Sequence, residues 1–550
     1  MRNWIRIVLS FSLFLIVALV FQNCSSSGMG KENLQSKANQ TSDPENDQNG
    51  NQTVETEQNE SDMTALSTKV HALTIVPPGK SSASFVRIVN TSSTVGTVTL
   101  TLFDRNGSRL NGAHPQYVFE LSPKATEVFS SSRLAEIFGV LSSRGTLEIT
   151  APTSIRVLNL LRDDVGTLLN LSRNEYSSDL SRSAIVLPNV IINNNAGADV
   201  SYVRIFNPSD TEILSGVISI LVYDQSGQFK GSYDLPKLAA HETLVLSGRK
   251  VDPTIQAIVD WTGELIGRAS VKIVSSSKVA LKAISLASTN DRSSTELSAS
   301  APRVALDGGV ENTHIVENVP GSSVTQDFGF IRIHNSADTA EQVYVHAYGE
   351  KNGVFKKLGF FPETIAAHST RVIPIIAAKR GDADYSLEDK VGVWNSRARV
   401  EVLDSGKPEK TIFVQTLFRS TGSIDGLSNV SCYNTHFDRG FFALPFSDNQ
   451  QETAWLRVYN RSLNSINLNG RLYSASGELL ARGTVATIPS QKPVVLSMDD
   501  VAHNLGISSW SARAYLEFEN FNENDLTAAV FFRSIEGKVL SAQSCSANPH

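Results

Sequence analysis

Residues 85–90, FVRIVN, consist of an aromatic residue, an aliphatic residue, an arginine, a second aliphatic residue, a variable position and an asparagine. The same order returns in residues 202–207 (YVRIFN), 330–335 (FIRIHN) and 455–460 (WLRVYN). The four arginines are 117, 128 and 125 residues apart, which is the length of a small domain rather than of a solenoid turn. The pattern therefore predicts four tandem copies of one domain in this chain of 550 residues.

The segments around each motif also recur in a fixed order. An alternating strand runs to a glycine turn, a further strand ends on serine or a polar turn, and two late strands close the copy. The turn glycines are Gly107, Gly227, Gly353 and Gly477. Short period-two runs of Val, Ile, Thr, Leu and aromatic residues between turns are typical of antiparallel strands, and about seven of them per copy indicate a β-sandwich.

The expected fold is therefore all-β, with four tandem antiparallel, immunoglobulin-like β-sandwich domains. They are assigned to residues 69–180, 181–310, 311–430 and 431–550. A short helix is expected after the serine-ended strand, with Asp252 as N-cap and Pro253 at the first helical position in the second copy, and Ser497 as N-cap in the fourth. Contacts between the domains are expected to be modest, as in other multidomain chains.

The repeated motif separates into two faces because side chains alternate along a strand. In the first copy Val86 and Ile88 point to the core, and Arg87 then lies on the outer face of the sandwich. The equivalent arginines are Arg204, Arg332 and Arg457. Two interpretations are open: a structural arginine held by aromatic rings or a carboxylate, and a repeated docking site for a sugar or carboxylate ligand. Recurrence in every copy favours the structural one.

An asparagine closes each motif. The four are Asn90, Asn207, Asn335 and Asn460. Each can end its strand by bonding the following backbone in an Asx turn.

The N-terminus has the pattern of a secretory signal peptide. Arg2 and Arg6 precede residues 7–21, which contain no charge, and Cys24 follows directly. This arrangement resembles the lipobox of bacterial lipoproteins, which implies a signal peptide in residues 1–23 and lipid on Cys24. Residues 24–68 carry eight acidic residues and two lysines with no aromatic residue, and are expected to be a disordered acidic tether. The resemblance implies attachment to the outer membrane, facing the periplasm or the medium.

Two further cysteines, Cys432 and Cys545, flank the strands of the fourth copy. The terminal strands of a sandwich often lie side by side, and an exported protein meets an oxidising compartment. With Cys24 lipidated, these two cysteines are expected to form a disulfide.

The motifs resemble repeat domains of secreted and surface proteins of Gram-negative bacteria. Residues 223–227, YDQSG, match the turn of those domains best, and residues 103–107, FDRNG, follow. The third and fourth copies lack the aspartate. The resemblance implies a β-repeat fold and a place at the cell envelope, but no chemistry.

No catalytic or cofactor motif is present in the sequence, and a net charge of −6 without a basic block argues against a nucleic-acid partner. The hypothesis is therefore a non-enzymatic, lipid-anchored envelope protein with a structural or adhesive role, without cofactor or metal. Its partners would be the membrane, through Cys24, and an unidentified glycan or protein. The alternative is a lectin-like receptor that uses one specialised copy.

Overall fold

The computed structural model describes residues 67–542 apart from internal gaps. The gaps are 165–167, 172–177, 180–183, 196–197, 251–254, 264, 289–293, 299–302, 306–311, 325–326, 380, 382, 407–409, 421–426, 430–440, 445–451, 511–512, 521–524 and 535–539. The described residues belong to one compact unit, Met63–His550.

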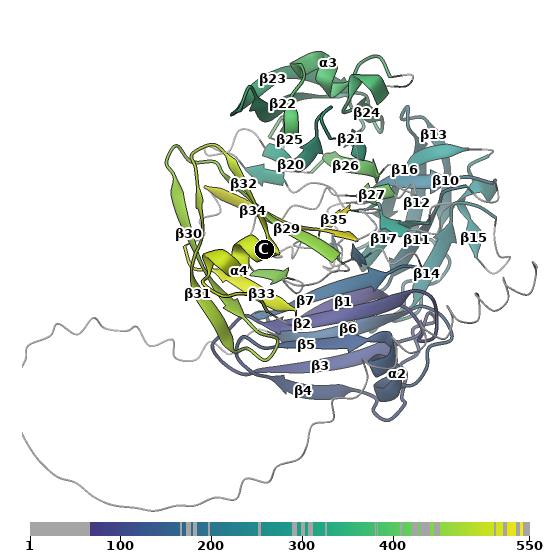
Figure 1. The fold of residues 1–550 in the computed structure, drawn as a ribbon. Coiled ribbons are helices and arrows are strands. Elements are labelled where there is room, and N and C mark those ends of the chain that lie inside the picture. The colour runs from purple at the N-terminus through teal and green to yellow at the C-terminus, as the bar shows by residue number, and fades with distance from the viewer. Residues whose placement is uncertain are drawn as a thin grey trace, which may run out of the picture. The chain divides into compact units, whose positions relative to one another are not determined.

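The fold is all-β, as the sequence predicts, with 58% strand and 7% helix. The described strands form eight sheets, whose pairings are antiparallel except for one short parallel contact between β14 and β15. These sheets occur along the chain two by two, so we call them the first (β1–β8), second (β9–β18), third (β19–β27) and fourth (β28–β35) sheet pairs (Figure 1).

The first and second sheet pairs follow each other with the same strand order. The first comprises β1 (Ser67–Ile75), β2 (Ala83–Asn90), β3 (Gly96–Phe103), β4 (Tyr117–Leu121), β5 (Thr126–Ser130), α2 (Ser131–Phe138), β6 (Gly145–Pro152), β7 (Ile155–Arg162) and β8 (Leu168–Asn170). The second comprises β9 (Ser178–Asp179), β10 (Ile185–Ile192), β11 (Val200–Phe206), β12 (Ile218–Asp224), β13 (Phe229–Asp234), β14 (Thr243–Ser247), β15 (Gln256–Ala257), η2 (Ile258–Asp260), β16 (Gly267–Ser275), β17 (Ala280–Ser288) and β18 (Ser294–Glu296).

The third and fourth sheet pairs repeat this order. The third comprises β19 (Arg303–Ala305), β20 (Asn312–Pro320), β21 (Asp327–Asn335), β22 (Glu341–Lys351), β23 (Val354–Ile365), β24 (Thr370–Pro374), η3 (Ala377–Lys379), α3 (Leu387–Val391), β25 (Asn395–Asp404), β26 (Ile412–Ser420) and β27 (Leu427–Asn429). The fourth comprises β28 (Phe441–Leu444), β29 (Glu452–Asn460), β30 (Ile466–Tyr473), β31 (Leu479–Ile488), β32 (Pro493–Ser497), α4 (Met498–Asn504), β33 (Ala514–Phe518), β34 (Leu526–Ser534) and β35 (Leu540–Ala542).

The strand with the repeated motif lies in the middle of one sheet in every pair. In the first pair β2 lies between β5 and β7, and β8 follows at the edge. The other three pairs place β11, β21 and β29 in the same way. Each motif thus occupies a central strand, where both edges of its backbone are hydrogen-bonded.

Each sheet pair encloses its own apolar core. Val86 and Ile88 of β2 are fully buried and pack with residues of β3, β6 and β7. The aliphatic positions of the other three motifs enter the corresponding cores. The core face assigned from alternation is therefore confirmed.

The short helices begin on serine caps. The Ser130 hydroxyl accepts a hydrogen bond from the Arg133 amide at the start of α2, and Ser497 forms a capping box with Asp500 at the start of α4. Apolar residues of both helices are buried in the cores beneath them. The helix expected in the second copy is instead one 3-10 turn, η2, which ends at Asp260; Asp252 and Pro253 lie outside the described residues.

The sheet pairs share apolar clusters where they meet. Phe206 and Ile284 of the second pair pack with residues of the first, and Ile191 packs with Leu417 of the third. Phe531 of the fourth pair belongs to the core of the third. One cluster joins the fourth pair to the first, so the four contacts close a cycle (Figure 1).

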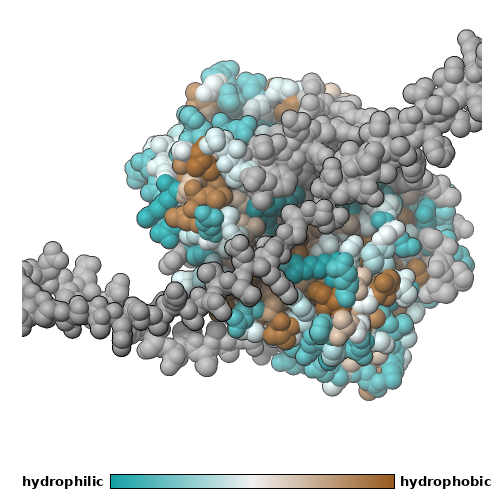
Figure 2. Space-filling view, turned by 60° about the horizontal axis from the view of Figure 1, so that its bottom comes forward, coloured by the Kyte–Doolittle hydropathy of each residue, from teal (hydrophilic) through white to brown (hydrophobic). Residues whose placement is uncertain are grey.

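The surface is mixed. Large apolar side chains with high exposure are spread over all four sheet pairs, and Figure 2 shows brown patches interspersed with hydrophilic residues on the face drawn. Isolated exposed apolar side chains of this kind are normal for globular proteins. The features that distinguish this fold therefore lie at the contacts between sheet pairs.

Candidate functional site

The four motif arginines are buried. Arg87, Arg204, Arg332 and Arg457 are 2%, 5%, 4% and 2% exposed. They do lie on the strand face that is turned away from the core of their own sheet pair, but another sheet pair covers that face. The repeated arginines therefore belong to interfaces and not to an open ligand face.

Three of the four arginines contact a polar group of the sheet pair that precedes their own in the cycle. Nε of Arg204 donates a hydrogen bond to the carbonyl oxygen of Leu73 over 3.1 Å. Arg87 of the first pair approaches the carbonyl oxygen of Ala514 in the fourth, at 3.4 Å from Nη2. These partners are backbone atoms or, at the interface between the third and fourth pairs, the carboxylate of Glu317.

Three of the turn glycines contact the neighbouring sheet pair at the interfaces where the motif arginines lie. A Cβ atom added to Gly107 would lie 2.1 Å from the carbonyl oxygen of Ala240, and one added to Gly227 would lie 2.2 Å from that of Ala367. Gly477 approaches Pro123 in the same way, which again joins the fourth pair to the first. Backbone contact this close leaves no room for a side chain, which explains glycine at this position beyond its positive φ.

The loop that receives each turn is also repeated. It contains a residue with left-handed φ, namely Lys124, His241, His368 and Gln491. Two residues further on, the amide of Thr126, Thr243 or Thr370 donates a hydrogen bond to the turn of the other sheet pair, over 2.8, 2.9 and 3.0 Å. The left-handed residues lie on the loops before β5, β14, β24 and β32, and the three threonines are the first residues of β5, β14 and β24. Neither group is predicted from the sequence.

The interface between the third and fourth pairs departs from this pattern. Position 493, which corresponds to the three threonines, is a proline and has no amide hydrogen to donate. The turn glycine there, Gly353, has no atom within 4 Å of a Cβ placed on it. At this interface a buried ion pair, Arg457 with Glu317, takes the place of the turn contact.

The motif asparagines form the Asx turns expected from the sequence. Nδ2 of Asn90 donates to the carbonyl oxygens of Thr94 and Leu121, while its Oδ1 accepts from the amide and hydroxyl of Ser92. Asn207, Asn335 and Asn460 make the same turn. All four side chains are fully buried and saturated, so they hold the loop after the motif.

A second arginine also repeats. It stands at the start of the first late strand, as Arg144, Arg268, Arg397 and Arg513. Strand register places these residues in equivalent positions, and three of them influence the motif arginine across the interface. In the sequence each of these arginines directly precedes one of the similar segments GTLEI, ASVKI, ARVEV and AYLEF. That recurrence could have identified them.

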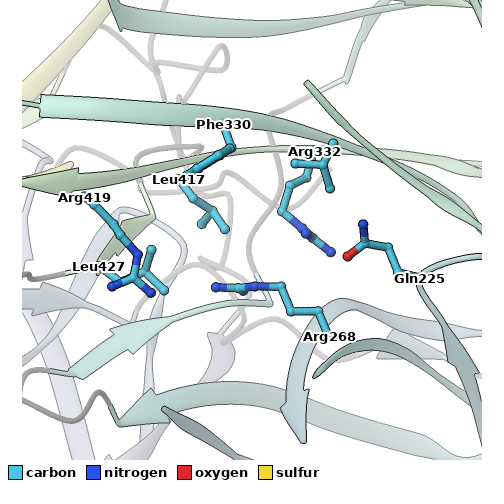
Figure 3. A pocket seen from close by; sticks show the side chains of 8 residues that line it. Gln225, Arg268, Phe330, Arg332, Leu417, Arg419 and Leu427 are labelled. Carbon is cyan, nitrogen blue, oxygen red and sulfur yellow. The ribbon is translucent and has the colours of Figure 1, made fainter. Parts of the chain in front are cut away.

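A cavity of about 310 Å³ lies between the second and third sheet pairs. The described residues that line it are Gln225, Arg268, Phe330, Arg332, Val372, Leu417, Arg419 and Leu427. Figure 3 shows the side chains of Arg268, Arg332 and Arg419 directed into the same space, with the Gln225 carboxamide beside them. The cavity thus combines three cationic groups with an apolar wall.

Hydrogen bonds orient two of these three arginines. Nη1 of Arg268 donates to Oδ1 of Asn189 over 2.7 Å, and Nη2 of Arg419 lies 3.0 Å from Oδ2 of Asp199. For Arg332, Nε and Nη2 are buried with no hydrogen-bond partner among the described residues. A buried guanidinium without an acceptor is costly to the fold.

Burial and like charge dominate the electrostatics of the cavity. Burial lowers the pKa of Arg332 well below its usual value, and the charge of Arg268 lowers it further. Burial lowers the pKa of Arg268 to about 10, with Arg419 acting in the same direction and Asp199 opposing it. Guanidinium groups carry a positive charge in proteins, so the three that line this cavity favour an anion.

The remaining predicted site residues are not placed by the structure. Cys24, Cys432 and Cys545 lie outside the described residues. In the described part of the chain, no group of three or more His, Cys, Asp and Glu side chains is arranged to hold a metal ion. Likewise, none of the described helices has the length and apolar character of a membrane span.

No protein-family model matches this chain, and no curated protein matches it significantly in sequence.

Proposed function

We propose that the protein is a non-enzymatic, lipid-anchored component of the cell envelope in which four immunoglobulin-like β-sandwich domains, one for each sheet pair, form a single structural body. One observation carries the proposal: the repeated groups serve the cycle of contacts. Three of the four turn glycines, the three threonine amides and three of the four motif arginines contact a neighbouring sheet pair. Repeated residues that join the sheet pairs would hold the four domains together as one rigid body. A rigid body on a tether suits a spacer, scaffold or adhesin.

The lipid anchor is proposed to be Cys24, behind a signal peptide of residues 1–23. The chain with Cys24→Ala should fail to incorporate radiolabelled palmitate and should appear in the soluble fraction instead of the membrane fraction. Cys432→Ala, made in parallel, should keep both the label and the membrane location. Label on the Cys24→Ala chain would contradict the anchor.

A ligand-binding function is the second candidate, and the cavity between the second and third sheet pairs favours it. Its three arginines point to an acidic ligand rather than to the neutral sugars that many lectins bind. A glycan array that includes uronic and sialic acids would compare the binding of acidic and neutral sugars. Retention of acidic glycans alone would support the cavity as the site, and retention of neutral glycans alone would contradict it.

A further inference from the structure

Among the residues that the structure describes, no acidic side chain lines the cavity between the second and third sheet pairs to balance its arginines. Of its eight lining residues three are arginines and none is acidic. Asp199 is bonded to Arg419, and Asn189 to Arg268. Arg332, which is 4% exposed, keeps two buried N–H groups without a partner in the described residues. An anionic group in the cavity would satisfy these donors.

The next interface in the cycle shows which group fits such an arginine. Arg457 occupies the position of Arg332 in the fourth sheet pair, and its Nε lies 3.3 Å from Oε2 of Glu317. Glu317 lies in the irregular stretch of β20 between Val316 and Val319. The carboxylate thus reaches the motif arginine from β20 of the preceding sheet pair.

The second sheet pair has a proline where the third has this glutamate. The irregular stretch of β10 lies between Leu187 and Val190, and the register of the partner strands aligns Pro188 with Glu317. Pro188 has no acceptor in its side chain. In the described part of this interface, Arg332 therefore lacks a carboxylate at the place that Glu317 has beside Arg457.

We propose that this cavity binds a small organic carboxylate, whose carboxylate group takes the place that Glu317 has at the neighbouring interface. The proposal deepens the ligand-binding candidate and does not depend on the lipid anchor. Arg332 would donate to the carboxylate from Nε and Nη2, and Arg268 and Arg419 would add positive charge on the other side. Arginine suits this role because its planar donors match the two oxygens of a carboxylate.

The rest of the cavity sets the class of ligand. Phe330, Val372, Leu417 and Leu427 give it an apolar wall, and its volume of about 310 Å³ lies at the lower end of small-molecule sites. A carboxylate with a compact apolar body fits this combination better than a polar polyol. The Gln225 carboxamide lies at the turn whose carbonyl oxygen accepts from the Thr370 amide, so the interface itself holds this side chain at the cavity.

The test is isothermal titration of the full-length chain, purified in detergent, at matched ionic strength. Benzoate and succinate serve as carboxylate probes, methyl benzoate as the uncharged control and inorganic phosphate as the competing anion class. We expect saturable binding of benzoate and none of methyl benzoate. Phosphate binding without benzoate binding, or equal binding of the ester, would overturn the carboxylate assignment.

Three variants locate the site. Arg332→Met should weaken benzoate binding by roughly ten- to hundredfold, because charge-assisted hydrogen bonds are lost. Pro188→Glu should abolish binding by supplying an internal carboxylate. Arg371→Met should leave binding unchanged, because Arg371 lies on the same strand as Val372 and pairs with Glu363 and Asp384 instead.

If Arg332→Met does not fold, Gln225→Leu tests the same cavity from an exposed position and should weaken binding measurably. Unchanged benzoate affinity in every variant that folds, whether Arg332→Met and Gln225→Leu or Gln225→Leu alone, would overturn the proposal. These outcomes are independent of palmitate labelling at Cys24, so a failed anchor and a failed site can be told apart.

Discussion

Arg457 of β29 and Glu317 of β20 form an ion pair between two sheet pairs, with 3.3 Å between Nε and Oε2 and both side chains buried. Arg399 lies on the other side of the same carboxylate, at 3.8 Å. Burial still raises the pKa of Glu317, although both arginines oppose that change. The pair is thus removed from water, so the charge of Arg457 and the charge of Glu317 each need the other for compensation.

Arg457→Met should therefore be strongly destabilising, by about 3 kcal/mol or more in the free energy of unfolding, because it weakens the compensation of a buried carboxylate. The double variant Arg457→Met with Glu317→Leu should recover most of this loss. Urea denaturation of the two single variants and the double variant gives the coupling energy. Additive losses would show that the pair does not act as a unit.

Arg332→Met should behave in the opposite way. It removes a buried guanidinium that, unlike Arg457, has no carboxylate beside it among the described residues, so the unliganded protein should keep its melting temperature or gain a few degrees. Differential scanning calorimetry in chloride buffer without carboxylates measures this. A loss of stability similar to that of Arg457→Met would mean that Arg332 has a stabilising partner.

The four turn glycines offer a matched comparison. Gly227→Ala should destabilise the protein by several kcal/mol, because the new methyl group meets the backbone of Ala367. Gly353→Ala has a similar positive φ, 74° against 88°, but open space around the new Cβ, so it should cost only about 1 kcal/mol. Equal losses in thermal denaturation would contradict the turn contact between the second and third sheet pairs.

The Asx turns predict that a small substitution at the asparagine lowers the free energy of unfolding more than one at the serine that follows it. Asn207→Asp keeps the acceptor for Ser209 but sets a buried carboxylate against the carbonyl oxygens of Thr211 and Ala239. It should cost about 2–3 kcal/mol. Ser209→Ala removes only the hydroxyl from the same turn and should cost less than about 1 kcal/mol. Chemical denaturation compares the two, and a larger loss for Ser209→Ala would be inconsistent with this geometry.

Acid should destabilise the fold through buried histidines. Burial lowers the pKa of His334 to about 3 and that of His71 to about 4, both below the value of about 6.5 in an unfolded chain. The unfolded state then binds more protons, so stability is complete above about pH 6.5 and falls as the pH drops towards 4. Each histidine contributes a loss of about 2 kcal/mol at pH 5.

His334→Gln should make this pH dependence shallower, since one of the groups that bind a proton on unfolding is removed. Denaturation midpoints of the wild-type chain and the variant at pH 5, 6 and 7 measure the difference. Parallel curves over this range would show that His334 is not buried as a neutral group.

Local pattern was enough to predict much of this fold. Alternation assigned Val86 and Ile88 to the core, and Ser130 and Ser497 cap helices at the positions where serine-ended strands stop. These features depend on neighbours in the sequence. The Asx turns of the motif belong to the same class, because their acceptors and donors lie a few residues away.

The interfaces could not be predicted in this way. Arg204 bonds a carbonyl oxygen 131 residues earlier, and nothing in its own strand indicates that partner. The cavity at Arg332 depends on a further arginine, Arg268, and on the absence of a carboxylate at Pro188. Comparing the copies position by position would have found both residues, whereas a search for known motifs could not.

The contact between the first and fourth sheet pairs has a consequence for biogenesis. Arg87 and Ala514 are 427 residues apart, and the cluster of Val89, Leu158 and Leu160 is completed only by Tyr473 and Tyr515. Because chains are made from the N-terminus, the first sheet pair exposes this apolar face until synthesis is almost finished. A prematurely terminated chain keeps that face uncovered, so it would be a substrate for chaperones and proteases, whereas the finished chain hides it.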